Sequence, residues 1–400
     1  MAGEVGVGDG VLVGVGWVVV VFGVCVGGCG GACKAKKYAK PANMSIATTI
    51  PIIIPLFISP IKLSIFKFCL RGMFICTGFT ASMRKTVALV FAAWAGLSAF
   101  FWPREAADAV LYSSILALAA LGLTLAYQTT KVPNFAHGAL INVGVVSALT
   151  VAQAFGKPTY YALLIGVPLA VVSALALYLV LLPLYKRGTQ AEVMMMATMA
   201  FNIIYIGLLN AYADWAGRSM GIFMRGITLR PYDVTIASVP GAYIIAPATT
   251  ALFALLLYLF LKTKVGTALR AAVENEDLAR TLGINVERAY AIAWAIAGTA
   301  AGVAGVYLPL YIEATPDVGW LMLASFFAAS IAGGLGSIYG ALAGGFLMGF
   351  VETLATLQFA TLLNWAFGIP QYQITAYRPL VPLLAIATVL LISPRGLLGK

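Results

Sequence analysis

The sequence has few charged residues and a single histidine, and both shortages limit the chemistry it can perform. Only 10% of its 400 residues are charged, whereas 62% are hydrophobic. A soluble domain carries about one quarter charged residues, so this chain has too little polar surface to be wetted on all sides. His137 has no obvious nucleophile, orienting carboxylate or companion metal ligand near it in the sequence. We therefore expect neither a catalytic centre nor a bound metal or cofactor, which argues against a membrane enzyme.

Cysteines and phosphate-binding motifs are also scarce. All five cysteines lie at or before Cys76. Cys25, Cys29 and Cys33 recur every four residues, but their surroundings are glycine-rich and contain no histidine, so a closed zinc site is not predicted. No glycine-rich loop ends in Lys-Ser or Lys-Thr, as nucleotide-binding loops do. The sequence GGLGS at 333–337 lacks the lysine, and we interpret it as a bend or a broken helix.

Long apolar runs are what the sequence has in abundance. Between residues 86 and 392 they recur with lengths of about 17 to 25 residues, enough to cross a hydrocarbon core as helices. The sequence therefore predicts an all-α, polytopic transmembrane bundle of about 8–10 helices. The candidate segments are residues 86–102, 109–128, 135–154, 161–182, 194–212, 243–261, 289–310, 322–336, 340–358 and 378–392.

The first 82 residues differ from the rest in composition. Residues 1–31 are dominated by glycine and valine, and the stretch has no convincing helical or strand period. At Met83 the pattern changes to Met-Arg-Lys followed directly by an apolar run, an ordinary start for a membrane protein with a cytoplasmic amino terminus. We expect residues 1–82 to be a non-native or disordered extension and residues 83–400 to form the transmembrane domain. A genuine extension or additional anchor is the alternative.

The net charge of +11 is distributed in short loops between apolar runs, which favours a topology signal over a nucleic-acid surface. If the first segment crosses outward, one side of the membrane receives most of the basic loops. By the positive-inside rule that side is the cytoplasm, and the carboxyl terminus lies there too. The cytoplasmic loops would contain Lys131, Lys186, Arg187, residues 262–288, Arg395 and Lys400. Arg218, Arg225 and Arg230, in a long loop on the opposite side, count against this orientation.

Pairs of glycines four residues apart indicate close helix contacts. Such spacing lets two backbones approach each other in lipid. The pairs are Gly298 with Gly302, Gly340 with Gly344, and Gly345 with Gly349. Packing within the bundle is the simpler interpretation, and a dimer contact is the alternative.

Residues 262–288 form the largest predicted cytoplasmic loop. Its middle is amphipathic and predicts a helix ending at Gly283, a residue that tolerates a left-handed backbone. Such a helix lies on the bilayer or docks into a groove of a partner. Because Glu274, Glu276 and Asp277 would repel anionic lipid, docking is the better interpretation.

A family resemblance emerges from this loop and three other stretches. Asn275 four residues before Ala279, then Gly283 and Ile284, resembles the coupling loop of ABC importer permeases. The other stretches are ALGLTLAY at 120–127 with VPNFAHGAL at 132–140, AGGLGSIYGALAGGFLMGFVE at 332–352, and SPRGLLG at 393–399. Together, over about residues 109–399, they resemble the permeases of branched-chain amino-acid importers.

The resemblance implies a plasma-membrane permease that pairs with itself or a sister permease. It also implies two ATP-binding cassette ATPase subunits inside and a solute-binding protein outside, with ATP hydrolysed by those partners. The implied ATPase-coupling residues are Ala272, Glu274, Asn275, Ala279, Gly283 and Ile284. An importer of urea or amides remains an alternative, since permeases of this group resemble one another across substrates.

Four polar residues in the predicted spans are candidates for the translocation path: Asn134, His137, Asn202 and Glu352. Polar residues at membrane depth are often functional, although interhelix packing is the simpler reading. Glu352 should face a polar cavity or be paired. An ion-coupled secondary transporter is a second class of function, but it would predict paired inverted repeats and more midplane ionisable residues.

We predict that the mature chain begins near Met83. Mass spectrometry of the purified protein should recover an amino-terminal peptide starting there. Abundant peptides from residues 1–82 would contradict this start.

Overall fold

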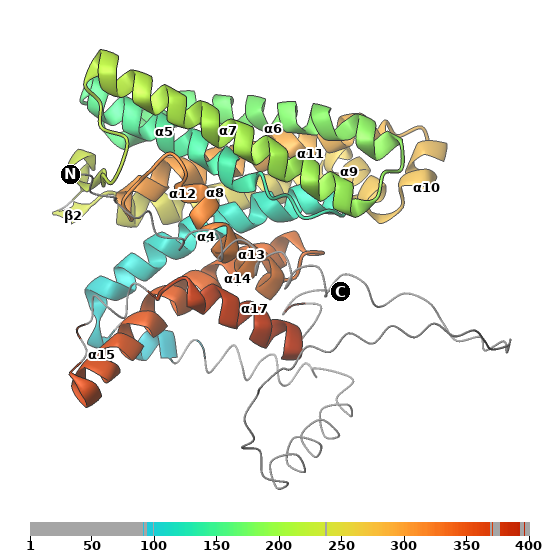
Figure 1. Ribbon diagram of the computed structural model, residues 1–400. Helices are drawn as coiled ribbons and strands as arrows, with labels where there is room; N and C mark the ends of the chain where they lie inside the picture. The colour runs from blue at the N-terminus through green and yellow to red at the C-terminus, as the bar shows by residue number, and fades with distance from the viewer. Residues whose placement is uncertain are drawn as a thin grey trace, which may run out of the picture. The chain divides into compact units, whose positions relative to one another are not determined.

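The computed structural model describes residues 91, 94–98, 100–236, 238–368, 370, 377–392 and 396, all within the unit Cys76–Lys400. The expected extension at residues 1–82 lies outside the described residues. Figure 1 shows that the described chain is a bundle of helices. In it, seven helical segments are long and apolar enough to cross a membrane, and two shorter apolar helices accompany them. The predicted all-α polytopic fold is confirmed.

The order of elements is simple and nearly free of strands. The helices are α4 (Pro103–Thr130), α5 (His137–Phe155), η1 (Thr159–Ala162), α6 (Leu163–Lys186), α7 (Ala191–Met220), η2 (Arg230–Tyr232), α8 (Ala242–Lys262), α9 (Lys264–Glu274), α10 (Glu276–Thr281), α11 (Val286–Tyr307), η3 (Leu308–Leu310), α12 (Val318–Leu321), α13 (Leu323–Gly333), α14 (Ile338–Phe350), the π-helical turn η4 (Val351–Ala355), α15 (Thr356–Phe367) and α17 (Leu380–Ile392). Strands β1 (Thr235–Ile236) and β2 (Val239–Pro240) pair antiparallel, with Ile236 opposite Val239.

Several boundaries differ from the sequence-based expectation. Glu105 and Asp108 were expected in a loop before a span starting at residue 109, but they lie inside α4, which begins at Pro103. Proline suits the first helical position because it has no amide hydrogen to leave unpaired. Segments 322–336 and 378–392 were expected to cross the membrane, yet α13 has 11 residues and α17 has 13. At 1.5 Å per residue they are about 17 and 20 Å long, shorter than the hydrocarbon core of about 30 Å.

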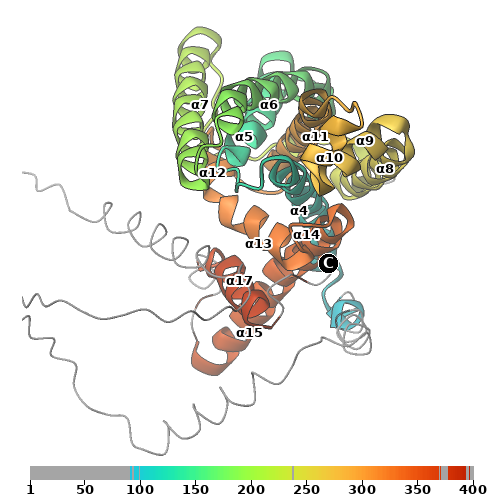
Figure 2. The same cartoon turned by 90° about the vertical axis from the view of Figure 1, so that its right-hand side faces the viewer.

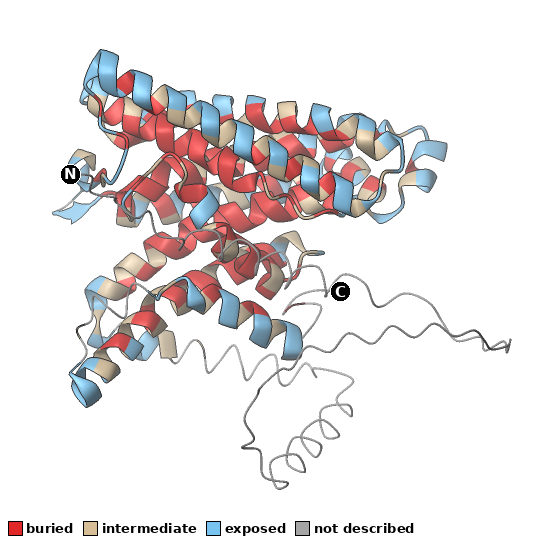
Figure 3. Ribbon diagram, in the orientation of Figure 1, coloured by how far each residue is buried: buried red, intermediate tan, exposed pale blue. Residues whose placement is uncertain are grey.

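Helix α4 is the centre of the bundle. In its most apolar stretch, 94% of the residues are buried inside the protein. Figure 2 looks along the bundle and shows α4 lying among α5, α8, α11, α13 and α14, and these helices all contact it. By contrast, only 17% of the corresponding stretch of α7 is buried, and Figure 3 shows its outer side exposed. Exposed apolar side chains on α7 are what a lipid-facing helix requires.

Glycines bring the helices around α4 into close contact. A Cβ atom added at Gly345 would lie 2.3 Å from Ala117 Cα of α4, and one at Gly305 would lie 2.1 Å from the Ile141 carbonyl oxygen of α5. Gly298 and Gly302 face α6, Gly340 and Gly344 face α13, and Gly349 faces Ser113 of α4. The glycine pairs seen in the sequence therefore pack helices of one chain together, as the simpler interpretation held.

Two interhelix connections lie within the bundle rather than beyond its end. His137, the first residue of α5, has its Nε2 atom 2.8 Å from the Ala119 carbonyl oxygen, about three helical turns before the end of α4. Residues 131–136 thus fold back along α4. Between α13 and α14, Gly334 has a φ of 105° and Ser337 caps α14 by accepting from the Gly340 amide at 3.1 Å. The predicted break at GGLGS is confirmed.

We predict that Gly305→Val destabilises the bundle, because the new side chain would meet the Ile141 carbonyl. Overpacking costs about 1–3 kcal/mol, or more where backbone must move. Thermal unfolding of the detergent-solubilised protein should show a midpoint lower by roughly 5 °C or more. Gly207→Val on exposed α7, where no atom lies within 4 Å of the added Cβ, is the control and should change the midpoint little. Equal effects of the two variants would contradict the packing argument.

Candidate functional site

The loop between α8 and α11 contains two short helices with well-defined ends. Thr263 caps α9 by accepting from the Gly266 amide at 3.2 Å. Asn275 has an extended backbone and caps α10 by accepting from the Leu278 amide at 3.0 Å. After α10, Gly283 has a φ of 80°, and the Ile284 amide donates to the Ala279 carbonyl at 3.0 Å. The predicted ending at Gly283 is confirmed, but the single helix expected before it is two helices, because Asn275 interrupts it.

Tyrosines and ion pairs anchor this loop to the ends of α6 and α11. The Tyr290 hydroxyl donates to the Ala272 carbonyl at 3.1 Å, and the Tyr185 hydroxyl donates to Glu276. Glu276 also pairs with Arg280 at 2.8 Å, and this hydrogen bond raises the pKa of the half-exposed guanidinium. Lys186 at the end of α6 pairs with Glu287 of α11 at 2.9 Å. The loop is therefore held as one piece with these two spans.

The six expected coupling residues divide into buried and exposed groups. Ala272 and Ala279 are each 1% exposed and pack in the core with Leu269 and Tyr290, so they anchor the loop and cannot contact a partner. Glu274, Asn275 and Gly283 are exposed, and Ile284 is half-buried.

Leu278 and Leu282 are 56% and 70% exposed. Sequence reasoning missed Leu278 but included Leu282 on the apolar side of the amphipathic segment. The signal that could have found them is two leucines four residues apart, one on the short helix α10 and one just after its end.

Three of the four candidate path residues lie in one region, where residues 134–137 meet α7. The Phe135 amide donates to Thr198 Oγ1 at 3.3 Å, and Asn202 is one turn further along α7. Asn134 accepts from the Ala136 amide at 3.0 Å through Oδ1. Nevertheless Asn134 Nδ2, His137 Nδ1 and Asn202 Oδ1 are buried and have no hydrogen-bond partner in the part of the chain that the structure describes. Such atoms are costly to bury and need water, an ion or a ligand.

Glu352 lies elsewhere. Its Oε1 accepts from the Tyr112 hydroxyl at 2.8 Å and from Arg378 Nε at 3.1 Å. Tyr112 is about two turns, or roughly 10 Å, along α4 from Ala119, the partner of His137. The expectation that Glu352 is paired is confirmed, but its partner was missed. The available signal was an isolated arginine immediately before the last apolar run.

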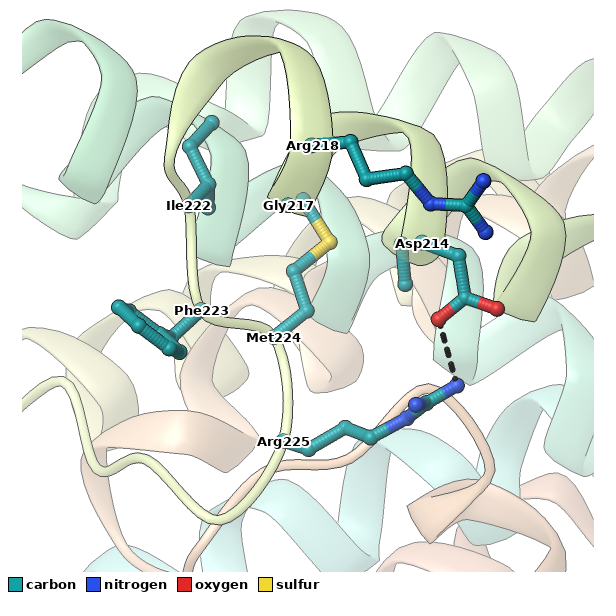
Figure 4. Close-up of a pocket in the computed structure, with 8 residues that line it drawn as sticks. Asp214, Gly217, Arg218, Ile222, Phe223, Met224 and Arg225 are labelled. Carbon is teal, nitrogen blue, oxygen red and sulfur yellow. Dashed lines mark ion pairs between the residues drawn. The ribbon is translucent and has the colours of Figure 1, made fainter.

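At the opposite end of the bundle, the carboxyl end of α7 borders an open pocket of about 440 Å³ (Figure 4). In this pocket Asp214 pairs with Arg225 at 3.0 Å. Arg230, further along the loop, pairs with Asp108 of α4 at 3.3 Å. Two of the three arginines that counted against the predicted orientation are thus matched by carboxylates at the same end. Among the described residues, no group of three or more His, Cys, Asp or Glu residues could hold a metal ion.

The fold and the two-helix loop define a polytopic membrane protein built around the continuous helix α4. The sequence pattern of the family described as "Branched-chain amino acid transport system / permease component" matches residues 106–390. The chain belongs to this family.

Curated relatives agree with this assignment. The chain is 39% identical over 292 residues to a "Probable branched-chain amino acid transport permease protein LivH" of Methanocaldococcus jannaschii, covering 73% of this chain and 90% of the relative. It is 29% identical to the LivH permease of the Escherichia coli K12 high-affinity branched-chain amino acid transport system, covering 73% and 94%. It is 25% identical to the corresponding BraD permease of Pseudomonas aeruginosa, covering 75% and 97%. These relatives are transport proteins by name, not enzymes.

We predict that Asn275→Ala loosens α10, because the Leu278 amide loses its acceptor. Loss of a helix cap costs about 1 kcal/mol. Hydrogen exchange at the Leu278 amide should accelerate roughly fivefold. Asn275→Asp, which retains a capping oxygen, is the matched control and should exchange at close to the original rate. No difference between alanine and aspartate would show that the cap does not hold α10.

Proposed function

We propose that this chain is the membrane-spanning permease subunit of an ATP-binding cassette importer for branched-chain or related small amino acids. In this proposal it receives substrate from an extracellular solute-binding protein and pairs with itself or a sister permease. Two separate ATPase subunits supply the energy. Family membership and the names of the relatives support the substrate class, and the organisation of the α9–α10 loop supports the coupling.

The orientation follows from the charges at the two ends of the bundle. We place the α9–α10 end and the carboxyl terminus in the cytoplasm. Basic residues gather at that end: Lys131, Lys186, Arg187, Lys262, Lys264, Arg270, Arg280 and Arg288. At the other end Arg225 and Arg230 are paired with carboxylates, which lowers their weight in the positive-inside rule.

The observation that carries the proposal is the exposure of Leu278 on α10 and of Leu282 just after it, in a segment that is fixed at both ends. The two leucines are one turn apart, so they form one apolar contact patch. Glu274 and Asp277 are exposed on the same loop, beside the exposed Arg270 and Arg280. A small apolar patch among charges of both signs, presented by a rigid loop, fits a groove on a soluble partner.

The anchoring explains how a partner's movement would reach the membrane. Glu276 is bound to α6 through Tyr185, and Ala272 is bound to α11 through Tyr290. Movement of the docked loop therefore acts on these two spans. Within the bundle, we propose that the unpartnered polar atoms of Asn134, His137 and Asn202 belong to the translocation path.

We predict that Leu278→Glu combined with Leu282→Glu releases the ATPase subunits. Both side chains are exposed, so the variant should insert and fold normally. Co-purification of the ATPases with tagged permease should fall at least tenfold, and ATP-dependent uptake of leucine by cells should be lost.

Phe223→Glu provides the control at the opposite end of the bundle, where the side chain is 73% exposed. This variant should retain the ATPases. Release of the ATPases by Phe223→Glu, with retention by the double leucine variant, would reverse the proposed orientation. Retention by both variants would remove α10 as the docking element. Ala279 is unsuitable for this test because its substitution would disturb the core.

A further inference from the structure

The ion pair between Glu352 and Arg378 is only half formed. A guanidinium and a carboxylate can make two parallel hydrogen bonds. Here Arg378 Nε donates to Glu352 Oε1 at 3.1 Å, and the Tyr112 hydroxyl donates to the same oxygen. Among the described residues, Glu352 Oε2 and Arg378 Nη2 are both buried and have no partner within hydrogen-bonding distance, and the hydroxyl groups of Ser325 and Tyr311 lie near the pair. One acceptor on the carboxylate and one donor on the guanidinium are thus left open.

Aromatic rings fix the guanidinium in place. Arg378 lies over the rings of Tyr112 and Tyr311, with its central carbon 4.5 and 5.2 Å from their centroids. The two rings are themselves stacked, with centroids 4.8 Å apart. Cation–π contact orients a cation without using its hydrogen-bond donors. The Nη2 donor is therefore presented in a defined direction and remains available.

The carboxylate of the pair also lies at an irregularity of the backbone, whereas the Arg378 side chain is 26% exposed. Glu352 is in the π-helical turn η4, and its side chain is 4% exposed. Single π-helical turns inside α-helices occur frequently at functional sites. The Oγ atom of Ser113, next to Tyr112 on α4, is a third buried polar atom without a hydrogen-bond partner among the described residues. If the ion pair only stabilised the fold, its polar atoms would be expected to hydrogen-bond with each other, because a buried charge without a partner is destabilising.

We propose that the open edge of the Glu352–Arg378 pair binds the zwitterionic head of an amino acid as it passes through the permease. The ammonium group would donate to Glu352 Oε2, and the carboxylate would accept from Arg378 Nη2. The inference rests on the proposed transport function and adds a substrate-contacting site to it.

The charges explain the choice of ligand. The pair is neutral, so a zwitterion satisfies both open atoms and leaves the site neutral. A carboxylate or an amine alone would leave one buried charge uncompensated. Urea and simple amides carry no charge and would make weaker hydrogen bonds than a charged group does. The site therefore favours amino acids over amides irrespective of the apolar side chain.

The test uses the complete complex of permease and ATPases in detergent, without the binding protein, so that a response to substrate comes from the membrane part. Thermal unfolding is measured with increasing leucine, with 4-methylpentanoate, which has only the carboxylate, and with 3-methylbutylamine, which has only the ammonium. Leucine should raise the midpoint in a saturable way, and the other two compounds should leave it unchanged at the same concentrations. No rise with leucine, or equal rises with the three compounds, would overturn the inference.

Variants distinguish a substrate-binding site from a purely structural ion pair whose open atoms are bridged by water. Glu352→Leu with Arg378→Met removes both charges, a change that buried pairs often tolerate. It should abolish the leucine response and lower uptake at least tenfold. Gln358→Leu is the control: it removes hydrogen bonds to Trp94 and Ser98 six residues along the same helical segment without changing a charge. That variant should keep the leucine response. An unchanged leucine response in the variant with Glu352→Leu and Arg378→Met would show that the ion pair has only a structural role.

If the double variant does not fold, Arg378→Lys is tested instead. This substitution keeps the positive charge but loses the two parallel donors of the guanidinium. It should require roughly tenfold or more leucine for half of the thermal response, and an unchanged requirement would overturn the inference. The outcome for transport itself is separate. A wild-type complex that takes up no leucine with its binding protein and ATP contradicts the proposed function. A wild-type complex that transports leucine but shows no zwitterion-specific response contradicts the site alone.

Discussion

The structure depends on one constraint, which is that backbone amides and carbonyls in a bilayer must find partners within the protein. Helix α4 meets it as an unbroken, 28-residue helix buried among its neighbours. The connections at 131–136 and 334–337 do not continue a helix, and they occur where protein surrounds them. Glycine makes this possible, because the Gly305–Ile141 and Gly345–Ala117 approaches place backbone against backbone with no room for a side chain. Close packing is what permits irregular backbone at membrane depth.

Irregular backbone in turn helps to bring polar groups together in the interior. The fold-back at 131–136 brings Asn134 and His137 beside α4 and α7, and the π-helical turn carries Glu352 to Tyr112 and Arg378. The two groups lie roughly 10 Å apart along α4. Each retains buried polar atoms without a partner. Because α4 borders both groups, a substrate that passes from one to the other would move along this helix.

Hydropathy alone predicted much of the fold, because a run that is apolar throughout needs no knowledge of its neighbours to be recognised as a helix. The break at GGLGS and the end at Gly283 were also predictable, since local backbone chemistry determines them. Burial was not predictable. In a chain that is apolar on every side, periodicity no longer distinguishes the face toward protein from the face toward lipid. In the α9–α10 loop, the family resemblance implied Ala279 as a contact residue, but Ala279 is buried and Leu278 is exposed. The pairing of Glu352 with Arg378 joins segments that only the tertiary fold brings together.

A continuous series of packed elements connects the α9–α10 loop with the polar groups beside α4. The loop is bound to α6 and α11 by Tyr185 and Tyr290. Gly298 and Gly302 join α11 to α6, and Gly305 joins α11 to α5, whose first residue is His137. Backbones in such close contact cannot slide independently, so a displacement of α11 must shift the start of α5 or open the contact at Gly305. A movement of the α9–α10 loop would therefore be transmitted to the polar residues near His137 mainly through backbone contacts, with few flexible side chains in between.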